Sequence, residues 1–316
     1  MNEVIDFGKS ILEIQSEIRD KFSPAIVARE FISRKESNDY MERQVRGLPF
    51  LTASDIDIDW DLFNFGLQRL NLLCKHRIEK PVKIKAIQSQ EEKQVLIHNM
   101  LNRDSTNSMN STNESSTSRG SRVFKGGGVS PLPLIIQLAF TPFMEKYANL
   151  LIEAERKSRL PRSGGGSGGR KYYKETNWLR GICPICGRDP FIAKIEPETG
   201  KRYLHCCLCR TEWAFKRIGC PFCGNIEQKK LRFFYVDENS PYRVDVCDEC
   251  KKYIKTVDTR KSEDRGQKTE NRKQKTENRK PIKDRVLFID YVTTTYLDKL
   301  AQDEGFYSPD TGLLEL

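Results

Sequence analysis

Apolar positions in the first half of the chain are spaced for helices. Apolar side chains recur mostly every three or four residues, which places them along one helical face. Five segments share this pattern: 3–21, 26–32, 60–76, 90–101 and 131–155. Pro142 lies inside the last segment, where we expect it to kink or break the helix. The pattern therefore predicts a mainly helical domain over residues 1–160.

Polar tracts divide the rest of the chain. Residues 103–128 are rich in Ser, Asn and Gly and have few apolar side chains to offset the entropy of ordering, so we expect a disordered polar insertion there. The Gly-rich residues 161–170 predict a flexible linker. Residues 259–284 contain two unchanged copies of QKTENRK and predict a disordered basic tract. A C-terminal helical segment is expected over 285–316.

Composition and charge limit the classes of protein without choosing one. The chain has 316 residues, 37% of them hydrophobic, and a net charge of +10. The basic tract supplies much of this excess, so the charge permits an acidic partner but does not identify one. No apolar run approaches the roughly 18 residues of a membrane-spanning helix, and the N-terminus lacks a secretory pattern. We therefore expect a cytoplasmic protein without membrane insertion, in which cysteines bind metal rather than form disulfides.

Four Cys-x-x-Cys pairs carry the main chemical signal. Two thiolates separated by two residues can hold one ion, and two such pairs complete a tetrahedral four-sulfur site. Pairing in chain order predicts one site in a first module, 171–219, and a second site in a second module, 220–258. The rival scheme joins the inner pairs and the outer pairs, which leaves a very long outer loop. The predicted ligands are Cys183, Cys186, Cys206, Cys209, Cys220, Cys223, Cys247 and Cys250.

Residues near the pairs have separate expected roles. Gly187 and Gly224 follow two of the pairs and permit the positive φ of a tight turn. Cys207 is left over inside its knuckle, and His205, which precedes Cys206, is an alternative to one sulfur. We expect Trp213 to bury its ring against the knuckle. A four-sulfur site suits zinc and iron equally well, and the isolated Cys74 in an apolar helical stripe is expected in the core.

Four motifs together resemble the FdhE-type formate dehydrogenase accessory (formation) proteins. They are GICPICG, GKRYLHCCLCRTEW, KRIGCPFCG and VCDECKKYIKTVD. The resemblance implies an α+β multidomain fold: a mainly helical N-terminal domain, two tandem rubredoxin-like or zinc-ribbon four-cysteine modules, and a C-terminal helix. It makes the eight paired cysteines ligands of two metal ions and favours iron over zinc. The chain departs from the family at Cys207, where serine is usual.

The resemblance also implies a function. It indicates a cytoplasmic accessory protein, not an enzyme, that is required for maturation of active formate dehydrogenase. Its implied partner is the catalytic subunit of a molybdenum- or tungsten-dependent enzyme. Glu212 and Trp213, in the most specific motif, are candidate partner-binding residues, although a structural role fits them equally well. Self-association stays open.

Two other functions fit parts of the sequence. The first is a rubredoxin-like iron redox carrier, which four-sulfur sites would permit. The second is a zinc-ribbon protein that binds nucleic acid through basic and aromatic residues. The aromatic residues suit small strand cores at least as well, so nucleic acid is the less expected partner. No nucleophile, base or phosphate-binding loop of an enzyme is recognisable.

Overall fold

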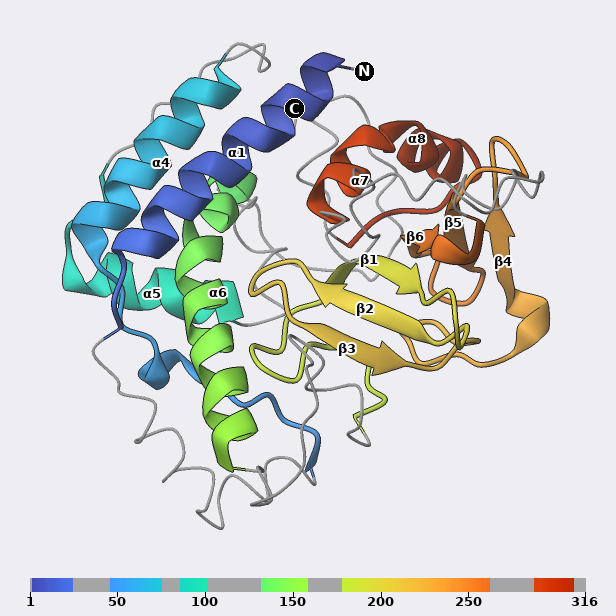
Figure 1. The fold of residues 1–316 in the computed structure, drawn as a ribbon, viewed down its shortest axis with the longest axis horizontal. Helices are drawn as coiled ribbons and strands as arrows, with labels where there is room; N and C mark the ends of the chain where they lie inside the picture. The colour runs from blue at the N-terminus through green and yellow to red at the C-terminus, as the bar shows by residue number, and fades with distance from the viewer. Residues whose placement is uncertain are drawn as a thin grey trace, which may run out of the picture.

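The computed structural model describes residues 2–24, 46–75, 86–101, 132–158, 178–261 and 287–309. These residues form a helical part, a sheet with two groups of cysteines, and C-terminal helices (Figure 1), which confirms the predicted fold class. The predicted helix at 26–32, the insertion at 103–128 and the linker at 161–170 lie outside the described residues. The basic tract lies outside them from residue 262 onward.

Among the described residues, the helical part contains four long helices and a short turn. They are α1 (Asn2–Lys21), the 3-10 turn η1 (Ala53–Asp55), α4 (Trp60–Cys74), α5 (Gln90–Leu101) and α6 (Leu132–Ser158). The apolar faces of α1, α4 and α6 pack on one another, with Ile11, Phe63 and Phe143 fully buried at their junction. Cys74 is buried in the same core, as its position in the apolar stripe predicted.

Helix α6 continues through Pro142 instead of ending there. A proline at position 142 has no N–H to donate to the carbonyl of Leu138, four residues earlier. The side chain of Gln15 on α1 donates its Nε2–H to that carbonyl at 2.8 Å, and Gln15 is itself buried. The neighbouring helix therefore satisfies the acceptor that proline leaves open, which explains why the helix is not broken.

The second half of the chain forms one six-stranded sheet. Its strands are β1 (Pro190–Ile195), β2 (Arg202–Cys206), β3 (Glu212–Phe215), β4 (Leu231–Phe234), β5 (Tyr242–Cys247) and β6 (Tyr253–Asp258). Their order is β3-β2-β1-β6-β5-β4. Strands β1 to β3 and strands β4 to β6 each form an antiparallel meander, and β1 pairs with β6 in parallel.

The parallel pair joins the two predicted modules into a single sheet. Ile192 of β1 lies opposite Lys255 of β6, and Ile195 lies opposite Asp258. Beyond β6, the turn η4 (Thr259–Lys261) donates the Thr259 hydroxyl to the carbonyl of Ile195 at 2.6 Å. The first three residues of the predicted basic tract are therefore ordered against β1.

Two C-terminal helices, α7 (Leu287–Thr293) and α8 (Thr295–Asp303), follow the sheet (Figure 1). Helix α8 packs on β5 and β6, whereas α7 packs on α1 and on β1. A buried polar network fastens them. The Lys255 ammonium on β6 lies 2.6 Å from the Asp298 carboxylate on α8 and donates to the carbonyl of Tyr291 at 2.7 Å. Tyr253 donates its hydroxyl to the other oxygen of Asp298 at 2.9 Å.

The helical part packs against the β1–β3 half of the sheet. Residues ahead of η1 run alongside the first cysteine knuckle, where Phe50 donates to the carbonyl of Pro184 at 2.8 Å and Leu51 to that of Ile185 at 2.7 Å. Apolar residues of the helices and of this half of the sheet form one continuous core. Among the described helices, none is long and apolar enough to cross a membrane.

Candidate metal centres

The four Cys-x-x-Cys segments fold into the same knuckle. In each, the N–H of the first cysteine donates to the carbonyl five residues later, at 2.8–3.0 Å. The residue after the second cysteine has a positive φ in every case: 77° at Gly187, 57° at Arg210, 78° at Gly224 and 57° at Lys251. Sequence reasoning predicted the two glycines and missed the two charged residues, because Arg and Lys rarely adopt this conformation.

The knuckles bring the cysteines together in chain order. Cys183, Cys186, Cys206 and Cys209 form the first cluster, and Cys220, Cys223, Cys247 and Cys250 form the second, with all sulfurs of a cluster within 4.8 Å of one another. These are the two sets that consecutive pairing predicted. All ten cysteines are free thiols in this structure, so none of them is joined in a disulfide.

The sulfur positions fit a tetrahedral ion. With a metal–sulfur bond of about 2.3 Å, two ligand sulfurs of a regular tetrahedron lie about 3.8 Å apart. In the first cluster the Sγ–Sγ distances are 3.5 Å for Cys183–Cys209 and 3.4 Å for Cys186–Cys206. In the second they are 3.6 Å for Cys220–Cys250 and 3.7 Å for Cys223–Cys247. A disulfide would need about 2.0 Å, so both clusters have the spacing of a four-thiolate site.

Backbone and side-chain donors surround the sulfurs. The N–H groups of Leu208 and Cys209 point to Cys206 Sγ at 3.3 and 3.4 Å, and the Phe222 N–H points to Cys220 Sγ at 3.4 Å. Thr211 Oγ1 lies 3.1 Å from Cys209 Sγ, within the first cluster. Donors of this kind stabilise thiolates that bind a metal.

Burial makes the first cluster dependent on a cation. It raises the pKa of the Cys183 and Cys186 thiols well above the ordinary value. Burial also opposes ionisation of Cys206, but hydrogen bonds from the neighbouring thiols outweigh it and lower the pKa of this group well below the usual range. A metal that binds the four sulfurs must therefore displace protons from Cys183 and Cys186.

The two clusters differ in exposure. All four cysteines of the first cluster are buried, whereas in the second Cys223 is exposed and Cys250 is partly exposed. The helical part accounts for the difference, because the segment at Pro49–Leu51 lies along the first knuckle. The first cluster is thus enclosed between the helices and the sheet, and the second opens to solvent at Cys223.

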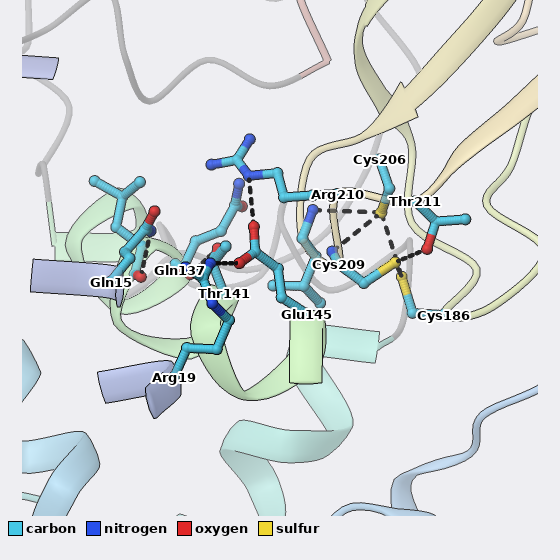
Figure 2. Close-up of polar contacts among 12 residues, drawn as sticks. Gln15, Arg19, Gln137, Thr141, Glu145, Cys186, Cys206, Cys209, Arg210 and Thr211 are labelled. Carbon is cyan, nitrogen blue, oxygen red and sulfur yellow. Dashed lines mark hydrogen bonds and ion pairs between the residues drawn. The ribbon is translucent and has the colours of Figure 1, made fainter. Parts of the chain in front are cut away.

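Arg210 connects the first cluster to the helices. Its guanidinium lies 4.8 Å from the ring centres of Phe191 and of Phe288, and its Nε is 3.9 Å from Glu145 Oε1 on α6. Figure 2 shows Glu145 between this arginine and Arg19 of α1, which is 2.5 Å away. Of the other cations that flank the clusters, Lys251 pairs with Asp248 at 3.1 Å.

His205 does not join a cysteine cluster. Its Nε2 lies 3.0 Å from Glu212 Oε2, and Lys194 Nζ lies 2.5 Å from the same oxygen. Burial lowers the pKa of His205 and also opposes ionisation of Glu212, but His205 and Lys194 outweigh that effect and hold the pKa of Glu212 below its usual range. Cys207 is buried outside both four-cysteine groups, and its N–H donates to the carbonyl of Asp189 at 3.2 Å.

The two candidate partner-binding residues lie in strand β3. Trp213 is fully buried and donates its ring N–H to the carbonyl of Arg180 at 2.9 Å. This burial agrees with the expectation that the ring packs near the knuckle, and it favours a structural role. Glu212 is mostly buried by its contacts to His205 and Lys194. The partner-binding role of both residues stays a prediction.

Comparison with known proteins gives three findings. The family described as "FdhE, central domain" matches residues 182–217, which contain the first cluster. An FdhE homolog of Aquifex aeolicus is 36% identical over 92 residues, which are 28% of this chain and 32% of that protein. The FdhE protein of Escherichia coli is 37% identical over 81 residues, 25% of this chain and 26% of that one. The chain thus matches about a quarter to a third of the length of these relatives.

A solved structure extends the likeness to the fold. The crystal structure of the FdhE protein from Pseudomonas aeruginosa superimposes with a TM-score of 0.53 over 99% of this chain and 93% of that one, at 15% identity. This identity shows a shared fold only. Together with the central-domain match and the two FdhE relatives, it confirms the resemblance to the FdhE family that the four motifs indicated.

Proposed function

We propose that the protein is an accessory factor in the maturation of formate dehydrogenase, and that it acts by binding the catalytic subunit without catalysing a reaction of its own. The observation that carries the proposal is the central domain with its first cysteine cluster, at residues 182–217. By resemblance, the partner is the catalytic subunit of a molybdenum- or tungsten-dependent enzyme. The cytoplasm is the expected compartment.

The proposed role of the metal ions is to hold the sheet in a fixed shape. The eight paired cysteines have the spacing and donor set of two four-thiolate sites. Iron is favoured by the resemblance and zinc suits the same sulfurs. A metal in each cluster would fix the ends of four strands, as metals do in small domains whose apolar core is limited. The sheet would then offer a partner a rigid surface.

A pull-down with two cysteine variants tests the proposal. The full chain, purified anaerobically, should retain the catalytic subunit of formate dehydrogenase. Cys183→Ala should lose the ion of the first cluster and with it most of the retained subunit. Cys207→Ser changes a buried thiol of the same knuckle that lies outside both four-cysteine groups, and it should retain both.

The outcome in cells decides the matter independently of folding. A strain that lacks the gene should produce inactive formate dehydrogenase, and the Cys207→Ser chain should restore activity. Full enzyme activity in the deletion strain would refute the proposal. So would normal retention of the subunit by Cys183→Ala chains that have lost their metal.

One observation favours a redox carrier as a second candidate. The exposed edge of the second cluster at Cys223 would let an electron donor approach a bound iron ion. Anaerobic metal analysis separates the two ideas, because a carrier needs iron in that cluster. Zinc in both clusters would remove the redox function and leave the accessory function intact.

A further inference from the structure

A cavity of about 350 Å³ lies beside the second cluster. It opens on the face of the β5–β6 half of the sheet that the C-terminal helices leave uncovered. Along β5, Val244 packs toward α8, while its neighbours Arg243 and Asp245 line the cavity. Val246 packs in the α8 cluster and also borders the cavity. On β6, Tyr253 packs with α8, and the next residue, Ile254, lines the cavity. The volume is within the range of small-molecule sites, about 300–1,000 Å³.

The cavity lining is strongly cationic. Six positively charged residues and a single carboxylate, Asp245, contribute to it. The six are Arg202, Arg217, Arg232, Arg243, Lys252 and Arg260. They come from both halves of the sheet, because Arg202 belongs to β2 whereas Arg232 and Arg243 belong to β4 and β5. The parallel pairing of β1 with β6 therefore assembles the charge.

The carboxylates near the cavity are fewer than its cations. Asp245 is shared, at 2.8 Å from Arg243 Nε and 3.2 Å from Arg202 Nη2, and it also accepts from the Thr256 hydroxyl at 2.7 Å. Asp248 pairs with Arg232, and Asp258 with Arg260.

Two cations are left over in this arrangement. Arg217 and Lys252 have no carboxylate partner among the residues that the structure describes, and the Nε of the buried Arg202 has no hydrogen-bond partner. The six cations of the lining exceed the three carboxylates Asp245, Asp248 and Asp258 by three charges, because Asp245 is shared between two arginines. A divalent ion bound by the four thiolates of the adjacent second cluster forms a dianion, which would offset two of these positive charges. The cavity therefore stays positive even when the cluster holds its metal.

The remaining walls of the cavity are apolar. Phe222 and Phe233 line it, together with Ile218 and Ile254. Phe233 is 53% exposed and Ile218 is 49% exposed, although both are large apolar side chains. Lys252 lies over the Phe222 ring, 5.8 Å from its centre. A ligand that carries both an anionic group and an apolar body would therefore find a partner for each.

We propose that this cavity binds a small organic anion, in which a phosphate or carboxylate group meets one of the two unpaired cations, Arg217 or Lys252, and an aromatic or aliphatic body lies against Phe222 or Phe233. Guanidinium groups bind such oxyanions through paired, charge-assisted hydrogen bonds, and lysine binds them as a point charge. The site uses no cysteine as a ligand, so its occupancy can be measured in the isolated protein.

Isothermal titration of the metal-loaded full chain tests the site with three probes. Phenyl phosphate carries both features of the proposed ligand, inorganic phosphate carries only the anion, and phenol carries only the ring. We expect one phenyl phosphate per chain with a dissociation constant below about 1 mM at 150 mM salt. We expect inorganic phosphate and phenol to bind at least about tenfold more weakly.

Substitutions identify the cavity as the place of binding. Either Arg217→Gln or Lys252→Gln should weaken phenyl phosphate at least about fivefold, because the cation that meets the phosphate makes a charge-assisted contact that glutamine cannot. Lys229→Gln removes the same charge from an exposed residue close by that does not line the cavity, and it should change binding less than twofold. No saturable binding of phenyl phosphate up to 10 mM (about ten times the expected constant) would overturn the proposal. An equal loss in Lys229→Gln would do the same, since the probe would then be responding to net charge alone.

Discussion

The buried pair of Lys255 and Asp298 offers the sharpest test of how the C-terminal helices are held. Both side chains are only 2% exposed, and the pair joins β6 to α8. In Asp298→Asn the side chain keeps its shape and an oxygen for the Tyr253 hydroxyl. It loses the negative charge, so the Lys255 ammonium keeps the Tyr291 carbonyl as an acceptor but loses the buried carboxylate that balances its charge.

The expected loss of stability is large. Removing one partner of a buried pair costs about 3–5 kcal/mol, because the other charge is left uncompensated. We expect the lower end, about 3 kcal/mol, since two acceptors of the network survive. With a urea dependence of about 1–3 kcal/mol per molar, this loss lowers the unfolding midpoint by about 1–3 M.

Urea unfolding of metal-loaded protein, followed by circular dichroism, measures the effect. Lys299→Gln is the matched control on the same helix, where the exposed Lys299–Asp303 pair should contribute nothing measurable. Hydrogen exchange should also show faster exchange in α7 and α8 of Asp298→Asn. The double variant Lys255→Met/Asp298→Leu should recover most of the loss, because it removes both charges. A midpoint for Asp298→Asn equal to that of Lys299→Gln would refute the reasoning.

Three further predictions follow from other contacts. Gln15→Leu should lower the free energy of unfolding by about 1–3 kcal/mol, since it leaves the Leu138 carbonyl of α6 buried without a donor; equal urea midpoints would contradict this. Gly181→Ala should reduce the metal content of the second cluster, because the added Cβ would lie 1.6 Å from the Pro221 carbonyl oxygen. In the control Gly224→Ala the added Cβ meets no atom within 4 Å, and the φ of 78° should lower the free energy of unfolding by only about 1–2 kcal/mol. A chelator should release the metal of the second cluster first, and iodoacetamide should then label Cys223 before Cys183, as peptide mass spectrometry will show; simultaneous release would contradict the difference in exposure.

The sequence predicts local structure around the cysteines well, because spacing and knuckle geometry are local properties. The gap of two residues, glycine after Cys186 and Cys223, and pairing in chain order all reappear in the structure. The apolar stripes likewise predict α1, α4, α5 and α6. The effect of Pro142 was harder to anticipate, since the outcome depends on Gln15, a residue 127 positions away in the chain.

The joining of the two sheet halves could not be predicted from the sequence. The spacing of the cysteines is equally compatible with two independent modules, because each meander satisfies its own cluster. The pairing of β1 with β6 depends on contacts between residues about sixty positions apart, and strands of this length carry no signal for their partner. The cationic cavity was missed for the same reason, since Arg202 and Arg243 reach their shared partner Asp245 only when the two halves pair into one sheet.

The enclosure of the first cluster implies different duties for the two sites. Glu145 of α6, through Arg210, and the segment at Pro49–Leu51 hold the first cluster against the helices. An ion in that cluster would therefore stabilise the joint between helices and sheet as well as its own knuckles. The second cluster is covered less completely: Tyr307 pairs with the residues that follow Cys250, but Cys223 stays exposed. This cluster borders the cationic cavity through Cys220 and Cys247. A change of metal in the second cluster can therefore alter that surface without disturbing the joint.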